Sequence, residues 1–394
     1  MATYDFDAPV ERRGTDSVKF DCAVRFGRPE DALPLWVADM DFPAPPAVLE
    51  ALSARVRHGV FGYTIAGDGY RAAVTGWLRD RHAWDIQPEW IVAIPGVVYG
   101  LSTAVRAFTE PGDAVVIQPP VYYPFGEVIR DNGRVVAQAP LVYGEGGRYT
   151  IDFEALEQAF EETGAKLFLL CSPHNPVGRV WREDELRRLG EICLAHDVIV
   201  ASDEIHMDFV RPGHTHIPFA SLSHELAERT VAFTSASKTF NLAGLQAANA
   251  IIANDALRER FARAVRVSAC NEPNVLGLVA NEAAYRHGAE WLDELRKYLE
   301  GNWNFLRDFL RQRIPALTLV EAEGTYLAWI DCRKLGLDDH ALKRFMLDEA
   351  KLWLDQGDMF GPEGGGFVRI NIATQRATLE RALVQLEHAV ASLR

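Results

Sequence analysis

Cysteine is scarce in this sequence. Its 394 residues include only five cysteines, an odd number placed at wide intervals and without a C-x-x-C pair. That pattern supports neither a disulfide framework nor a thiolate zinc site or a dithiol redox site. We therefore expect buried free thiols at Cys22, Cys171, Cys193, Cys270 and Cys332.

Excess positive charge is absent as well. Lys and Arg number 41 against 55 Asp and Glu, which gives a formal net charge of -14. Negative charge opposes a phosphate backbone, so we expect no nucleic-acid partner.

The sequence also lacks long apolar runs. Stretches without charge, such as residues 239–254, are short and interrupted by Asn, Gln and Gly, so no membrane span is expected. The first residues, MATYDFDAPVERRG, have no basic segment followed by an apolar one, which predicts no secretion signal and a cytoplasmic protein.

What the sequence does contain is the composition and length of a multidomain globular protein. Hydrophobic residues make up 48% and charged residues 24%. At about 150 residues per domain, the length predicts two or three domains. No period of about 20 to 50 residues recurs, which excludes solenoids and propellers.

Short apolar runs alternate with amphipathic stretches from residue 91 onward. Helical spacing of apolar residues is found in FEALEQAFEETG and EDELRRLGEICLAH. The expected strands are IVAI, AVVI, RVVAQA, KLFLLC, VIVAS, TVAFTS and ANAIIA. This alternation predicts an α/β domain whose largely parallel sheet is covered by helices on both faces.

The pattern changes after residue 272. Two long helical patterns end at Pro315, and TLVEA, YLAWIDC and FVRINIA then read as strands of a smaller α+β unit, with helices near 338–350 and 377–393. The Pro-rich segment LPLWVADMDFPAPPAVL is not expected to form a regular helix and should cross between the units. We predict a large domain at 45–285 and a discontinuous small domain at 1–44 and 286–394.

Two ionisable residues stand directly after predicted strands, where α/β sheets build their sites. Lys238, in TSASKTFNLAG, leaves a buried strand, so partial desolvation should lower its pKa and favour Schiff-base chemistry. The ordinary alternative is a solvated surface lysine. Asp203, in SDEIH, could hold a protonated pyridine nitrogen, cap a helix, or join a metal site with His206. Too few further ligands converge for a metal to be expected.

Other candidates are weaker individually. Asn175, in SPHNPVG, could be a turn former only, and Tyr122, in PPVYYPF, could pack in the core or stack on a flat cofactor ring. PGVVYG places the amides around Gly96 at the start of a helix, which suits an anion. Arg369 is the lone cation of an apolar strand, where it could form a buried ion pair or bind a substrate carboxylate.

As an ordered set, these motifs are far more specific. PGVVYG, PPVYYPF, SPHNPVG, SDEIH, SASKTFN and FVRINIA resemble the fold-type I pyridoxal-phosphate enzymes, the aspartate aminotransferase superfamily, along nearly the whole chain. LPLWVADMDFPAP, HGVFGYT, LLCSPHNPVGRVW, HIPFASLS and TYLAWIDCRKLGL are similar to the MalY/PatB branch of cystathionine β-lyases. The resemblance implies an α/β fold-type I transferase, with a large domain built on a mostly parallel mixed sheet flanked by helices, plus a smaller α+β domain.

The resemblance also implies roles for individual residues around pyridoxal 5'-phosphate. Lys238 would be the Schiff-base lysine, Asp203 the partner of the pyridine nitrogen with support from His206, Asn175 a donor to the phenolic oxygen, and Tyr122 the stacked ring. Arg369, with Asn175, would bind the α-carboxylate of a small amino-acid substrate. The residues implied to surround the phosphate are Gly96, Val97, Val98, Ser235, Ser237 and, from the second subunit of a homodimer with shared sites, Tyr63.

One position departs from the wider superfamily. Where an arginine eight residues after the lysine commonly pairs with the phosphate, this chain has Gln246. The departure weakens the case for an ordinary aminotransferase and leaves more of the phosphate binding to amides and hydroxyls.

The implied reaction is α,β-elimination of L-cystathionine, and possibly of cysteine or S-substituted cysteines, to a thiol, pyruvate and ammonia. An aminotransferase with the same residues is the first alternative. The S-x-x-K pattern at Ser235 to Lys238 also matches serine acyl-transferring enzymes, but the S-D-N and K-T-G partners that such enzymes need are missing. A regulatory role, as associated with some members of the branch, is neither supported nor excluded by these residues.

Overall fold

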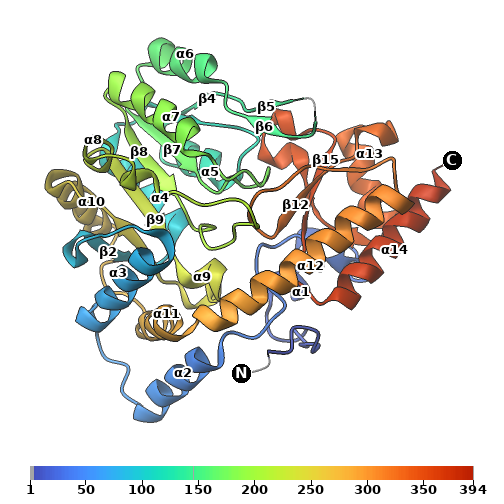
Figure 1. The fold of residues 1–394 in the computed structure, drawn as a ribbon, viewed down its shortest axis with the longest axis horizontal. Coiled ribbons are helices and arrows are strands. Elements are labelled where there is room, and N and C mark those ends of the chain that lie inside the picture. Colours follow the sequence, from blue (N-terminus) through green and yellow to red (C-terminus); the bar gives the residue numbers. More distant parts are fainter. Residues whose placement is uncertain (1–3, 145, 394) are drawn as a thin grey trace.

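The large sheet confirms the expected α/β architecture. This computed structural model describes residues 4–144 and 146–393 (Figure 1). Seven strands form the sheet, in the order β2 (Ile91–Ile94), β10 (Ala248–Ile251), β9 (Thr230–Thr234), β8 (Ile199–Asp203), β7 (Leu167–Cys171), β3 (Ala114–Ile117) and β4 (Val135–Gln138). All neighbours are parallel except β10, which runs antiparallel to both β2 and β9. All seven expected strands are present.

Helices cover both faces of this sheet because its strands are apolar on both sides. In β7, Phe168 and Leu170 join one buried cluster, whereas Leu167 and Leu169 join another, as the two-residue period of a strand requires. The first cluster contains α6 (Phe153–Thr163) and α7 (Glu183–Ala195), and the second contains α4 (Val97–Phe108), α5 (Pro124–Asp131) and α10 (Asp255–Val267). Two clusters of the core therefore lie on either side of this sheet.

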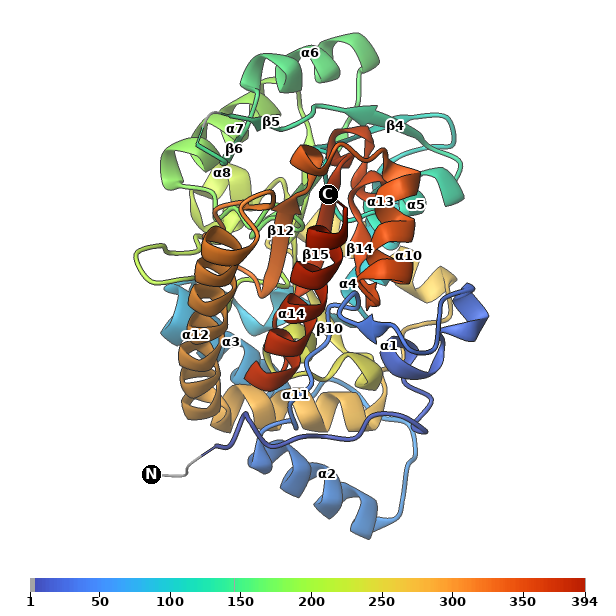
Figure 2. The same cartoon turned by 90° about the vertical axis from the view of Figure 1, so that its right-hand side faces the viewer.

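A second, four-stranded sheet is built from the C-terminal part of the chain. Its antiparallel strands have the order β11 (Thr318–Leu319), β12 (Leu327–Asp331), β15 (Phe367–Asn371) and β14 (Asp355–Gln356). Figure 2 shows α12 (Ala289–Arg313) and α14 (Arg376–Ser392) lying side by side beside β12 and β15. The α+β character expected after residue 315 is confirmed, and the domain limits at 44/45 and 285/286 stay a prediction.

The N-terminal segment reaches into this C-terminal part. Its strand β1 (Leu33–Pro34) pairs in parallel with β13 (Leu352–Trp353). The expectation that LPLWVADMDFPAPPAVL is wholly non-helical is wrong at its end, because α2 (Pro46–His58) begins at Pro46. Proline is compatible with the first helical position, where its missing N–H has no helical partner to lose.

The remaining elements connect these layers. They are α1 (Val18–Asp21), α3 (Asp68–His82), the hairpin β5 (Val142–Tyr143) and β6 (Tyr149–Thr150), α8 (His224–Ala227), α9 (Ala236–Thr239), α11 (Val275–His287) and α13 (Asp339–Arg344). Within residues 4–144 and 146–393, no helix is long and apolar enough to cross a membrane. All five cysteines are free, as expected. Cys171, Cys193 and Cys332 are buried, but the expectation of burial is wrong for Cys22 and Cys270, which are only partly buried.

Candidate active site

Most of the predicted site residues meet at one cavity of about 210 Å³. They meet there because β2, β7, β8 and β9 run in the same direction, so the segments that follow them share one edge of the sheet. The predicted residues that line the cavity are Gly96, Val97, Val98, Tyr122, Asn175, Asp203, His206, Ser237 and Lys238, and Gln246 lines it as well.

Three of the predicted residues, Ser235, Tyr63 and Arg369, do not line this cavity. The hydroxyl of Ser235 donates to the carbonyl oxygen of Ala247 at 2.8 Å and accepts from the Ser237 amide at 3.0 Å. Ser235 is thus committed to capping α9. Tyr63 lies between α2 and α3 with 93% of its surface exposed, so it contributes nothing to the cavity of its own chain.

Burial controls the charges of Asp203, Lys238 and His206 in the cavity. It raises the pKa of Asp203 to about 7. It lowers the pKa of Lys238 to about 8, although the charges of Asp39 and Asp203 oppose that shift. It also lowers the pKa of His206 well below its usual value, so this imidazole is neutral at neutral pH. The cavity therefore holds an amine that gains and loses a proton near neutral pH.

Several polar atoms around the cavity are able to form further hydrogen bonds. One oxygen of Asp203 accepts from the Ile205 amide at 3.1 Å, and no other hydrogen bond of its carboxyl is found in the described part of the chain. The Nδ1 atom of His206 is buried and has no partner among the same residues. Buried polar atoms of this kind are costly unless a bound group satisfies them.

Arg369, on β15, lies in a second cavity of about 540 Å³ that Lys238 and Tyr122 also line. Its Nη1 donates to Asn175 Oδ1 at 2.8 Å, and its Nη2 donates to the carbonyl oxygen of Trp36 at 3.0 Å and forms an ion pair with Asp355. Both side chains of the pair are almost fully buried, 2% and 3% exposed. The Nε of Arg369 has no partner within residues 4–144 and 146–393, so one donor of the buried guanidinium is free for a ligand.

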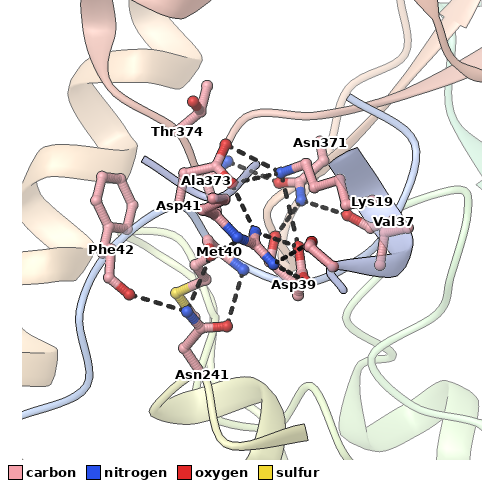
Figure 3. A network of polar contacts seen from close by, with 12 residues as sticks. Lys19, Val37, Asp39, Met40, Asp41, Phe42, Asn241, Asn371, Ala373 and Thr374 are labelled. Atoms are coloured by element: carbon pink, nitrogen blue, oxygen red, sulfur yellow. Dashed lines mark hydrogen bonds and ion pairs between the residues drawn. The ribbon is translucent and has the colours of Figure 1, made fainter. Parts of the chain in front are cut away.

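Residues 36–42, which we call the strap, border the site, because Trp36, Val37 and Ala38 line its cavities. Figure 3 shows the polar contacts that hold the strap. Lys238 Nζ donates to the carbonyl oxygen of Ala38 at 2.6 Å. Asn371 holds the strap by donating to the carbonyl oxygens of Val37 and Asp39, and Asn241 donates to those of Met40 and Phe42. Lys238 and Arg369 are therefore both oriented by backbone carbonyls of the strap.

Ion pairs with Arg12 and Lys19 of the N-terminal segment hold the strap in place. Arg12 pairs with Asp39 at 2.6 Å and with Asp41 at 2.8 Å, and Lys19 pairs with Asp41 at 2.9 Å. No role was predicted for these charges or for Asp355. The acidic residues within the apolar run LPLWVADMDF were the available signal, because a buried acid needs a cation.

Asp208, which was not predicted either, contacts Thr239, the residue that follows Lys238. Asp208 accepts from Thr239 Oγ1 at 2.6 Å, from His82 Nε2 at 2.8 Å and from Trp77 Nε1 at 3.1 Å. Burial alone would raise the pKa of Asp208, but these hydrogen bonds outweigh it and hold the pKa below its usual value. Asp208 thus anchors the residue that follows Lys238.

Comparison with known proteins agrees with this geometry. The family model described as aminotransferase class I and II matches residues 30–386. Cystathionine β-lyase PatB of Bacillus subtilis is 46% identical over 386 residues, which cover 98% of this chain and 100% of PatB. Protein MalY of Escherichia coli is 38% identical over 394 residues, 99% of this chain and 100% of MalY. The structure of cystalysin from Treponema denticola, which contains a pyridoxal 5'-phosphate cofactor, superposes with a TM-score of 0.96 at 40% identity over 100% of both chains.

The chain belongs to the class I and II aminotransferase family, whose fold it shares. Within that family it is a member of the branch that contains MalY and PatB.

Proposed function

We propose that the chain cleaves the carbon-sulfur bond of L-cystathionine by α,β-elimination and that the cavity residues carry out this reaction. The chain is a pyridoxal-phosphate-dependent carbon-sulfur β-lyase. One cystathionine and one water give one homocysteine, one pyruvate and one ammonia. The observation that carries this proposal is the convergence of Lys238, Asp203, Asn175 and Arg369 on adjoining cavities in a chain that is 46% identical to PatB.

The residues present fit the cofactor. The carboxyl of Asp203 and the orphaned Nδ1 of His206 are available to a heterocycle, and a Cβ built on Gly96 meets nothing within 4 Å, which leaves room beside the first amides of α4. When bound, pyridoxal phosphate supplies an electron sink for negative charge at the substrate Cα. Asp203 would hold the proton of the pyridine nitrogen, and Asn175 would donate to the phenolic oxygen. The residues proposed for the remaining contacts are Tyr122 for the ring face, and Gly96, Val97, Val98, Ser237 and Tyr63 of the partner subunit for the phosphate.

Ser235 has a narrower role in this proposal than the resemblance implies. Its hydroxyl is committed to Ala247 and to the Ser237 amide, so it would orient Ser237 and the start of α9 rather than donate to the phosphate itself.

Lys238 is the residue proposed to move protons. With a pKa of about 8, its amine can exchange between the protonated and the neutral form near neutral pH, so it can both accept and return a proton. The carbonyl oxygen of Ala38 orients Nζ of Lys238. The negative charge of Asp39 partly offsets the fall in the pKa of Lys238 that burial causes. Lys238 would therefore take the Cα proton and return a proton to the departing sulfur.

Arg369 is proposed to fix the substrate by its α-carboxylate. A guanidinium binds a carboxylate through paired, charge-assisted hydrogen bonds, and the unpartnered Nε provides a donor for one of them. Arg369 Nη1 donates to the side-chain oxygen of Asn175, so the Asn175 side chain would connect Arg369 with the cofactor site.

The test is an assay of pyruvate and free thiol released from L-cystathionine by the holoenzyme. We expect equal amounts of both, and we expect Lys238→Ala to abolish their release together with the visible absorbance of the bound cofactor. Formation of pyridoxamine phosphate and the keto acid of the intact substrate, without pyruvate, would instead establish the aminotransferase.

We further propose a homodimer with shared active sites. The segment between α2 and α3 exposes Val60 (61%), Phe61 (53%), Tyr63 (93%) and Ile65 (80%), an apolar group that a second copy would cover. Tyr63 could then contribute to the neighbouring site. An active monomer in sedimentation equilibrium would contradict this proposal.

We also propose that the enzyme works in the cytoplasm. Its five cysteines are all free, as is usual where glutathione and thioredoxin keep thiols reduced. Fractionation of the source cells with antibody detection would test this assignment.

A further inference from the structure

The cavity that contains Arg369 extends well beyond the reacting atoms. Its volume of about 540 Å³ is within the range of about 300–1000 Å³ that encloses whole small ligands. Lys238, Tyr122 and Arg369 line it together with residues of the N-terminal segment and of the 343–359 region. With the substrate's α-carboxylate on Arg369, the group beyond the sulfur would enter this outer part, which we call the distal pocket.

Two cations of the distal pocket have no carboxylate partner. Arg28 and Lys343 both line it, and neither forms an ion pair with any residue in 4–144 or 146–393. The Nε of Arg28 is buried without a hydrogen-bond partner among those residues. Such a donor is costly to leave unsatisfied, whereas a ligand carboxylate would satisfy it with a charge-assisted bond.

The distal pocket also presents a free anion. Asp358, in the turn Gly357–Phe360, lines the same cavity, is exposed, and makes no ion pair within the described residues. Asp355 differs, because its charge is already matched by Arg369. Cations and an unpaired carboxylate around one cavity are complementary to a zwitterion.

Three aromatic rings line the same cavity as these charges. Trp36 and Trp353 stack with ring centroids 4.5 Å apart and planes 13° apart, and Phe26 meets both edge-on at 5.7 and 6.0 Å. All three line the cavity. Packed aromatic rings form a rigid apolar surface along which the methylene groups of a thioether can lie.

We propose that the distal pocket binds the amino-acid head of the leaving group, its carboxylate on Arg28 and Lys343 and its ammonium on Asp358. The proposal rests on the lyase function above and narrows its substrate class. The preferred substrates are thioethers that join two amino-acid heads, ahead of cysteine and S-alkyl cysteines.

The test compares kcat/KM of the holoenzyme for four S-substituted cysteines. L-Cystathionine carries both distal charges, S-carboxyethyl-L-cysteine only the anion, S-aminoethyl-L-cysteine only the cation, and S-propyl-L-cysteine neither. For Arg28→Gln and Lys343→Gln, kcat/KM relative to the propyl substrate should fall about tenfold for the two carboxylate substrates, as for loss of one charge-assisted bond, and chiefly through KM. Asp358→Asn should instead lower the ratio for the two substrates with a distal ammonium.

The matched controls are Arg25→Gln and Arg344→Gln. Both residues are exposed, lie close in sequence to the tested cations and do not line the cavity. Their ratios should stay within about twofold of the wild type.

A second measurement does not depend on turnover. Deaminated cystathionine keeps the thioether and both carboxylates but has no amine with which to react. By calorimetry, the holoenzyme should bind it about tenfold more tightly than the matching monocarboxylate, and Arg28→Gln with Lys343→Gln should remove the difference.

If kcat/KM relative to the propyl substrate stayed unchanged in Arg28→Gln, Lys343→Gln and Asp358→Asn, the proposed role of the distal pocket would be wrong. That result differs from a failure of the lyase assignment, in which the wild type would release thiol from none of the four substrates.

Discussion

The buried pair of Arg369 and Asp355 allows substrate recognition to be separated from stability. Arg369→Gln removes the guanidinium and leaves the Asp355 carboxyl, 3% exposed, without a cation. Removing one partner of a buried pair costs about 3–5 kcal/mol of unfolding free energy. Because burial already raises the pKa of Asp355, this carboxyl can take up a proton, so we expect the lower end, about 3 kcal/mol.

The pH dependence has a definite sign. A carboxyl whose folded pKa lies above its unfolded value stabilises the fold least where it is ionised. The stability lost in Arg369→Gln should therefore grow as the pH rises and shrink as it falls. Urea unfolding at several pH values measures this directly.

The effect on catalysis is distinct. Loss of the charge-assisted contact to the substrate carboxylate is worth about 2–5 kcal/mol, or about 30-fold to 4,000-fold in kcat/KM for L-cystathionine. Adding Asp355→Asn to Arg369→Gln removes the stranded acid, so stability should recover while kcat/KM stays low.

The double variant decides between the two effects. If it regained kcat/KM to within about threefold of the wild type, the loss in the single variant would have come from the stranded acid, and Arg369 would not bind the substrate.

Three further predictions follow from the site and its surroundings. In the cofactor-free protein, burial favours protonated Asp203, so its contribution to stability should be present below about pH 4 and lost as the pH rises through about 7. Asp203→Asn should flatten the melting-temperature profile over that range, and an unchanged profile would contradict the buried acid. Asp208→Asn, which weakens the hydrogen bond that holds Thr239 next to Lys238, should lower kcat about tenfold with little change in KM. A rise in KM alone would show that Asp208 does not position Lys238. Ile65→Asp should sediment as an inactive monomer, whereas Val135→Asp, at another exposed apolar site, should leave the dimer intact.

The parts of the site that the sequence predicted are those that follow strands directly. Asp203 ends β8, Asn175 follows β7 and Lys238 lies in the turn of helix after β9, so the alternation of strands and helices was enough to bring them to one edge. The apolar runs of these strands are unambiguous because both faces are buried.

The parts that could not be predicted depend on contacts between distant segments. Lys238 and Ala38 are 200 residues apart in the chain, and Arg369 and Trp36 are 333 apart. No local pattern specifies such pairs. Ser235 shows a second limit, since spacing alone does not reveal that its hydroxyl caps α9 and donates to the carbonyl oxygen of Ala247.

The parallel pairing of β1 with β13 has a consequence for synthesis. Leu33 leaves the ribosome 319 residues earlier than its partner Leu352. At about 5–20 residues per second, the N-terminal segment waits roughly 20 to 60 seconds for its partner strand. The strap can settle against Asn371 only after that delay, so a nascent chain interrupted late, with most of its large sheet already made, still has no oriented Lys238 and no substrate arginine.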